Sequence, residues 1–111
     1  GNDCLDFSYG DYFLNNLNLS KCQDKAVSTG EASKLEINNF LIKDSLIGIA
    51  SKDSAIVNST DGSIEKVRNC LSLYKKKQEF NGGMLKYSNL KCDDYQDFVY
   101  LDSYSKLIKL N

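Results

Sequence analysis

The sequence contains no histidine, no proline and no tryptophan. Without histidine, every mechanism that needs an imidazole as a base or a metal ligand is excluded. Without proline, sharp bends have to be made by glycine, asparagine and aspartate. With no tryptophan and only five phenylalanines, the core has to be built mainly from aliphatic side chains.

Two further absences exclude classes of partner. The 14 Lys and Arg residues are balanced by 15 Asp and Glu residues, so no basic excess attracts a nucleic-acid backbone and we expect no nucleic-acid partner. No apolar run approaches the ~18 residues of a spanning helix, so we expect no membrane span. The chain is long enough for a modest core, and we predict that residues 1–111 form one domain.

A repeat of 22 residues runs through most of the chain. Four rows begin at this spacing, with Cys4, Ala26, Gly48 and Cys70. The apolar residues that follow also align, namely Leu5, Val27, Ile49 and Leu71. Within each row apolar residues alternate with a period of two, which is typical of β-strands. A repeat of this kind indicates a solenoid.

Corners interrupt the alternation in each row, as in the jump of three from Leu14 to Leu17. The corner pairs are Asn15-Asn16, Asn38-Asn39, Thr60-Asp61 and Ser88-Asn89. Asn and Asp tolerate the left-handed backbone, and their stacked side chains can hydrogen-bond between coils. Alternation and β-branched residues disfavour a helical solenoid. The pattern predicts an all-β fold, a right-handed parallel β-helix of about four and a half coils of ~22 residues with three short strands each.

The four cysteines are expected to be free thiols. Cys4 and Cys70 share a repeat position three coils apart, which is about 14 Å at ~4.8 Å per coil and beyond the ~7 Å that a disulfide allows. Cys22 and Cys92 are also about three coils apart. The cysteine spacing does not indicate zinc, and "CDDYQD" (92–97) is at best a weak cation site, so we expect no cofactor and no metal.

Charged residues gather where the first strand of each coil ends. The aligned segments are "SYGD" (8–11), "TGEA" (29–32), "SKDS" (51–54) and the longer "YKKKQEFNGG" (74–83). Stacking would place these charges along one ridge. One interpretation is a solvated ladder of ion pairs, each contributing only ~0–1 kcal/mol. The other is a binding or catalytic edge, because loops that project from a rigid scaffold often carry function.

Beside the ridge, we expect the outward face of the first strands to expose small side chains, such as Ala26, Ser28, Gly48 and Ala50. With the ridge lysines on one flank, this strip would form a shallow groove for a glycan or a protein. The candidate ligand-binding residues are Asp6, Lys25, Ser28, Glu31, Lys52, Asp53, Lys76, Lys77 and Glu79. No catalytic residue is assigned, because Asp3 and Asp6 lie about 10 Å apart on opposite faces of a strand, a poor pair for a hydrolase.

A β-helix has an open sheet edge at each end, which is normally covered. No amphipathic helix precedes Cys4, and "DSYSKLIKLN" after Leu101 is too short for a lid. We therefore expect the chain to be the C-terminal part of a larger protein. Its open coil ends would stack on the rest of the parent chain or on another copy.

Several segments resemble a known family, namely "DCLDFSYGDYFLNNLNLSKCQDKAVSTGE", "IGIASKDSAIV" and "CLSLYKKKQEFNGG". They are similar to the C-terminal right-handed β-helix region of large bacterial surface proteins, some of which carry a spore-coat-kinase-like (CotH-type) domain. The resemblance covers most of residues 3–92 and implies an extracellular or cell-surface location. The third coil departs from the family pattern, because Ser59 and Gly62 take aliphatic positions, and looser packing is expected there.

Two hypotheses for function follow. The first is a non-catalytic surface module that binds a polysaccharide, an acidic one if the ridge lysines contact it, or a protein partner. The second is a polysaccharide-modifying enzyme of the lyase, hydrolase or epimerase type, with a site completed by missing N-terminal coils. A hydrolase needs two carboxylates across the sugar bond, one of them protonated.

Overall fold

The computed structural model describes residues 2–110, which form strands and turns but no helix. The strands are β1 (Leu5–Ser8), β2 (Asp11–Ser20), β3 (Lys25–Gly30), β4 (Lys34–Lys52), β5 (Ile56–Tyr74), β6 (Met84–Leu101) and β7 (Lys106–Lys109). All strand pairs are parallel. Among the residues described, then, nothing forms a helix able to span a membrane.

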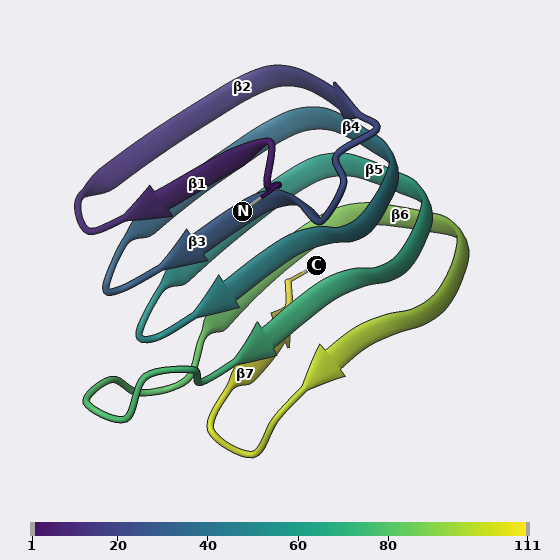
Figure 1. Cartoon of the computed structure of the whole chain (residues 1–111). Coiled ribbons are helices and arrows are strands. Elements are labelled where there is room, and N and C mark those ends of the chain that lie inside the picture. Colours follow the sequence, from purple (N-terminus) through teal and green to yellow (C-terminus); the bar gives the residue numbers. More distant parts are fainter. Residues whose placement is uncertain (1, 111) are drawn as a thin grey trace.

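The strands wind into a parallel β-solenoid of about five turns with a repeat of ~22 residues. In Figure 1 the chain crosses the back of the molecule, curves round at the right and returns along the front, one level lower with each circuit, which is a right-handed path. The predicted stacking of Val27, Ile49 and Leu71 is confirmed by the strand register. The predicted fold class is therefore confirmed, with slightly more coils than expected.

The predicted corners adopt the left-handed conformation. Their φ angles lie between 53° and 58° at Asn16, Asn39, Asp61 and Asn89. Side chains also bond between coils, because Asn39 Nδ2 donates to Asn15 Oδ1 at 2.9 Å and Asn89 Nδ2 to Asp61 Oδ1 at 2.7 Å. A second left-handed corner in each coil was not predicted, at Lys21, Asp44, Lys66 and Asp94.

The interior is filled by aliphatic side chains. The largest fully buried ones include Leu35, Ile37, Ile42, Ile49, Ile64, Leu71, Leu73 and Leu85. The expected loose packing in the third coil is wrong at Gly62, because the Phe40 ring occupies the space that a side chain there would take. A Cβ on Gly62 would lie 2.0 Å from Cζ of Phe40. Ser59 is buried as well, and its hydroxyl has no hydrogen-bond partner among the described residues.

The repeat position shared by Ala26, Gly48 and Cys70 points inward, which corrects the expected outward strip. Ala26 and Cys70 belong to the core cluster. A Cβ on Gly48 would lie 2.9 Å from Cγ2 of Ile64, itself a core residue. The residues on either side pair regularly between coils, but this position does not. The strand bends here, so two successive residues face the core and the alternation restarts.

Cys4 and Cys22 form a disulfide, with Cα atoms 5.5 Å apart. The expectation of four free thiols is therefore wrong for this pair. That expectation rested on the distance between cysteines three coils apart. The observed bond instead joins the beginning and the end of the first coil, 18 residues apart in sequence. Cys70 and Cys92 are free.

Replacing Ile49 by Ala tests the packing of the solenoid. Ile49 is fully buried and pairs with Val27 on one side and Leu71 on the other, so Ile49→Ala should lower the free energy of unfolding by about 2–5 kcal/mol. The measurement is unfolding in urea followed by circular dichroism. The exposed Leu46 provides the control, since Leu46→Ala leaves no cavity. Equal effects of the two changes would contradict this packing.

Candidate functional site

The turns that end each circuit stack into one surface, here called the turn edge, made of residues 8–11, 30–34, 52–56, 74–84 and 101–106. Backbone hydrogen bonds join the turns. Tyr9 N–H donates to the Glu31 carbonyl at 2.9 Å, Ala32 N–H to the Asp53 carbonyl at 2.9 Å, and Ser54 N–H to the Asn81 carbonyl at 3.0 Å. Charged residues from separate coils are thereby held at one edge of the molecule.

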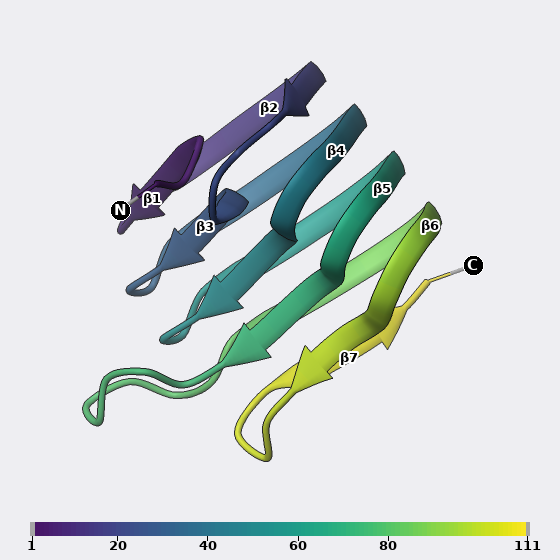
Figure 2. The same ribbon diagram turned by 45° about the vertical axis from the view of Figure 1, so that its right-hand side comes forward.

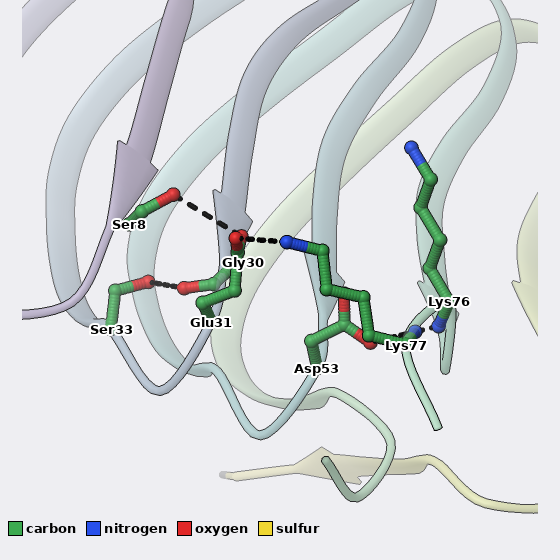
Figure 3. Close-up of polar contacts among 7 residues, drawn as sticks. All are labelled: Ser8, Gly30, Glu31, Ser33, Asp53, Lys76 and Lys77. Atoms are coloured by element: carbon green, nitrogen blue, oxygen red, sulfur yellow. Dashed lines mark hydrogen bonds and ion pairs between the residues drawn. The ribbon is translucent and has the colours of Figure 1, made fainter. Parts of the chain in front are cut away.

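The longest of these turns is the lysine loop, residues 75–83, between β5 and β6. Figures 1 and 2 show it extending beyond the neighbouring turns. Two carboxylates hold its beginning, because Asp53 Oδ1 accepts from the backbone N–H groups of Lys76 and Lys77, both at 2.8 Å (Figure 3). Asp102 Oδ2 accepts from the backbone N–H of Lys75 at 2.8 Å. Three successive backbone donors thus receive a charged acceptor.

The end of the lysine loop is also held. The Asn81 N–H donates to Ser54 Oγ at 2.8 Å, and the Gly83 N–H to Ser105 Oγ at 3.0 Å. Gly83 packs so closely that a Cβ there would lie 1.8 Å from the Ser51 carbonyl oxygen. Glycine is therefore required here for close approach of two backbones. The loop is fixed at both ends.

Side chains of the lysine loop reach the turns of earlier coils. Lys77 Nζ lies 2.6 Å from Glu31 Oε2, and Ser8 Oγ donates to the other oxygen of Glu31 at 3.2 Å (Figure 3). The Phe80 ring lies 6.5 Å from the Tyr9 ring. The hydrogen bond from Lys77 lowers the pKa of Glu31, and Ser8 adds to this effect.

The other candidate residues of the turn edge differ in exposure. Lys52 is half-buried, and its Cε lies 3.1 Å from the point where Gly30 would carry a Cβ. Lys76 and Glu79 are exposed, and Figure 3 shows the Lys76 side chain extending away from Lys77. Asp53 is fully buried, and its second oxygen has no partner among the described residues. Asp53 therefore holds the lysine loop by hydrogen bonds to its backbone and does not contact solvent.

Three candidates lie on the strands, behind the turn edge. Asp6 is exposed on β1. Lys25, at the start of β3, forms ion pairs with Asp24 at 3.0 Å and Asp3 at 4.0 Å. Burial opposes its charge, but the hydrogen bond to Asp24 and the nearby carboxylates outweigh it and raise the pKa of Lys25. Ser28 is fully buried with no partner for its hydroxyl among residues 2–110.

The expected strip of exposed small residues is not available to a ligand. Ser28, Ala50 and Ser72 are at most 2% exposed. The half-buried Tyr74 extends from the turn edge toward Lys25, whose charge acts on its hydroxyl group. Burial raises the pKa of Tyr74 although Lys25 opposes the shift. Of the two surfaces predicted to bind a ligand, only the turn edge is accessible.

Two exposed tyrosines of the turn edge were missed by the sequence interpretation, which named mainly charged residues there. Tyr9 is 58% exposed and Tyr104 is 66% exposed. Lys75 Nζ lies 4.7 Å from the centre of the Tyr104 ring, a cation–π contact. A usable signal was present, since tyrosine stands in the turn segments "SYGD", "YKKK" and "DSYSK".

A hollow of about 470 Å³ is lined by Arg68, Asn69, Asp97 and Tyr100, among others, and it extends to Leu101 of the turn edge. It contains none of the candidate residues. No group of three or more Cys, Asp or Glu side chains within residues 2–110 is placed to hold a metal ion. No protein-family model, curated protein or solved structure matches the chain.

Removing the Asp53 carboxylate tests whether it holds the lysine loop. Asp53→Ala leaves two backbone N–H groups without their acceptor, at about 1–3 kcal/mol for each one left buried. The Lys76 and Lys77 amides should exchange with deuterium much faster than in the wild type, measured by NMR. Asp53→Asn keeps a carbonyl oxygen as acceptor and should retain most of the protection. Unchanged exchange in Asp53→Ala would show that the loop is held by other contacts.

The contact between Lys77 and Glu31 predicts a specific titration. Because the folded-state pKa of Glu31 is lowered from 4.5, the pair stabilises the fold above that pH and the contribution is lost as the pH falls through the lower value. In Lys77→Ser the pKa of Glu31 should return toward 4.5, as followed by carboxylate NMR shifts. Lys76→Ser is the control and should leave it lowered. An identical titration in both variants would refute the assigned contact.

Proposed function

We propose that the chain is a non-catalytic surface module that binds acidic polysaccharides through its turn edge. One observation carries this proposal: a lysine loop fixed at both ends presents basic side chains beside exposed tyrosine rings. The basic groups suit carboxylate or sulfate groups of a glycan. The tyrosine rings combine an apolar face with a hydroxyl group, which suits the mixed surface of a sugar.

The rigidity of the lysine loop supports binding. A loop that is already ordered loses little conformational entropy when a ligand arrives. The carboxylates of Asp53 and Asp102 point at backbone N–H groups, so they do not form ion pairs with the ammonium groups of Lys75 and Lys76. These two lysines are therefore available to an anionic ligand, Lys76 in full and Lys75 from its position over Tyr104.

An extracellular or cell-surface location is part of the same proposal. The Cys4–Cys22 disulfide supports it, because disulfides persist mainly in oxidising compartments. The resemblance to the β-helix region of bacterial surface proteins, including those with a CotH-type domain, supports it as well. A rigid solenoid is a suitable support for an adhesive surface, since its loops project from a fixed scaffold.

The alternative, a polysaccharide-modifying enzyme, receives less support from the turn edge. A glycoside hydrolase needs a carboxylic acid that stays protonated near neutral pH. Glu31 is unsuited to that role because its pKa is lowered. Asp53 is unsuited because it is buried with backbone N–H groups as partners of one oxygen. The remaining carboxylates at this edge include the exposed Glu79.

Replacing the charged residues of the lysine loop tests the proposed binding. We expect the wild type to bind dextran sulfate and polygalacturonate but not neutral dextran, with affinity that falls as salt screens charges over ~10 Å. The triple variant Lys76→Ser, Lys77→Ser, Glu79→Ser should lose at least about tenfold in affinity, equivalent to ~1.4 kcal/mol. Its melting temperature should stay within a few degrees of the wild type, since exposed ion pairs contribute little. Isothermal titration calorimetry and thermal scans provide the two measurements.

A matched control separates the position of the charges from their number. The variant Lys43→Ser, Lys66→Ser, Glu36→Ser makes the same change in net charge at exposed residues away from the turn edge, and it should bind as the wild type does. Equal losses in both variants would mean that net charge alone attracts the polymer. Equal binding by the wild type and the loop variant would support the other interpretation, in which the turn edge is only a solvated ladder of ion pairs. Release of shortened or unsaturated sugars would instead favour the enzyme.

A further inference from the structure

The two free cysteines lie together in the core near the end of the solenoid opposite the Cys4–Cys22 bond. Cys70 is fully buried at the bend of β5, and Cys92 is half-buried on β6, one coil further along. Both pack in or against the main core cluster. The neighbouring Cys70 thiol raises the pKa of Cys92.

The repeat itself directs the Cys70 side chain at Cys92. One coil earlier, a Cβ at Gly48 would lie 2.9 Å from Cγ2 of Ile64. Cys70 stands at the position equivalent to Gly48, because the residues that flank both positions pair in register. Cys92 pairs directly with Ile64. A side chain at position 48 would point at Ile64. The Cys70 side chain, one coil further along, therefore points at Cys92.

The existing disulfide uses the same repeat position. Cys4 occupies in the first row the place that Cys70 occupies in the fourth, and it bonds to Cys22, which faces the core at the second corner. In both cases a cysteine at the bend meets a cysteine of the adjoining part of the coil. A chain that carries the first bond encounters conditions in which thiols oxidise.

We propose that Cys70 and Cys92 are a second disulfide site, which closes the last full coil as Cys4–Cys22 closes the first. With a small-molecule disulfide such as oxidised glutathione as oxidant, the more accessible Cys92 gives up its proton and its sulfur attacks, which releases one glutathione thiol and leaves a mixed disulfide. The Cys70 sulfur, after losing its proton, attacks Cys92 and releases the second thiol. Two protein thiols are oxidised, one small disulfide is reduced, and the two protons end on the two glutathione thiols.

The environment of the pair makes this exchange slow. The contact with Cys70 comes first, and burial second, in raising the pKa of Cys92. A protonated thiol is a poor nucleophile, so the thiols should remain reduced during short exposure to the oxidant and react over hours. We therefore expect the Cys70–Cys92 bond to form slowly under oxidising conditions.

Peptide mapping of the wild-type protein tests the proposal directly. The folded protein is incubated overnight with oxidised glutathione, denatured, treated with iodoacetamide and digested with trypsin. Cleavage after Arg68, Lys75, Lys91 and Lys106 releases the peptides 69–75 and 92–106. We expect these two peptides joined by a bond that dithiothreitol breaks. Alkylated Cys70 and Cys92, or glutathione that stays attached to Cys92, would overturn the proposal.

Variants show whether the bond acts on the fold. In the double variant Cys4→Ser, Cys22→Ser, any disulfide within one chain is the Cys70–Cys92 bond, and its oxidation should raise the melting temperature by several degrees. Adding Cys92→Ala to this variant should remove that increase. An equal increase with and without Cys92 would contradict a role for the bond. If the variants do not fold, the wild-type peptide map still decides between bonded and free thiols.

Discussion

The register of hydrogen bonds between parallel coils is the constraint on which the rest of the structure depends. Strands stack at ~4.8 Å with equivalent residues above one another. An extra residue inside a strand would turn every following inward side chain outward. The additional residues of the fourth coil therefore lie outside the strands, between Tyr74 and Met84, while the strands on both sides keep their partners. The lysine loop projects because the register leaves no other place for it.

A projecting loop needs acceptors for backbone N–H groups that no longer pair with a neighbouring coil. Asp53 and Asp102 supply them at the start of the loop, and Ser54 and Ser105 at its end. The hydrogen bonds to Asp53 explain why an aspartate interrupts the apolar run "IGIASKDSAIV". Asp53 belongs structurally to the loop of a later coil, to which it offers a buried charged acceptor. The feature proposed to bind a ligand thus depends on residues that never contact it.

The parts of the fold that could be predicted from sequence are those where local physics restricts the residue type. Alternation predicted the strands, and Asn and Asp predicted the corners at Asn16 and Asn39 because they tolerate left-handed backbone. The second corner was not predicted, although Asp44 and Asp94 carry the same signal there; Lys21 and Lys66 carry none, because lysine has no such preference and the stacked coils impose the conformation. At the candidate site, the stacking of charged turns was predictable from the spacing. The exposed tyrosines carried a signal as well, since tyrosine recurs in the turn segments, but they were missed because a tyrosine can equally fit the core.

The bend at the position of Gly48 accounts for the remaining errors. Strict alternation places successive residues on opposite faces, so it assigned Cys4 and Cys70 to the outward face. At the bend both successive residues face inward, and the space is small, since a Cβ on Gly48 would lie 2.5 Å from the Cys70 carbonyl oxygen. Small residues occupy this position in the inner coils, and cysteine occupies it near both ends. The Cys4–Cys22 bond thus links the bend, a position that does not pair regularly between coils, to the other end of its coil.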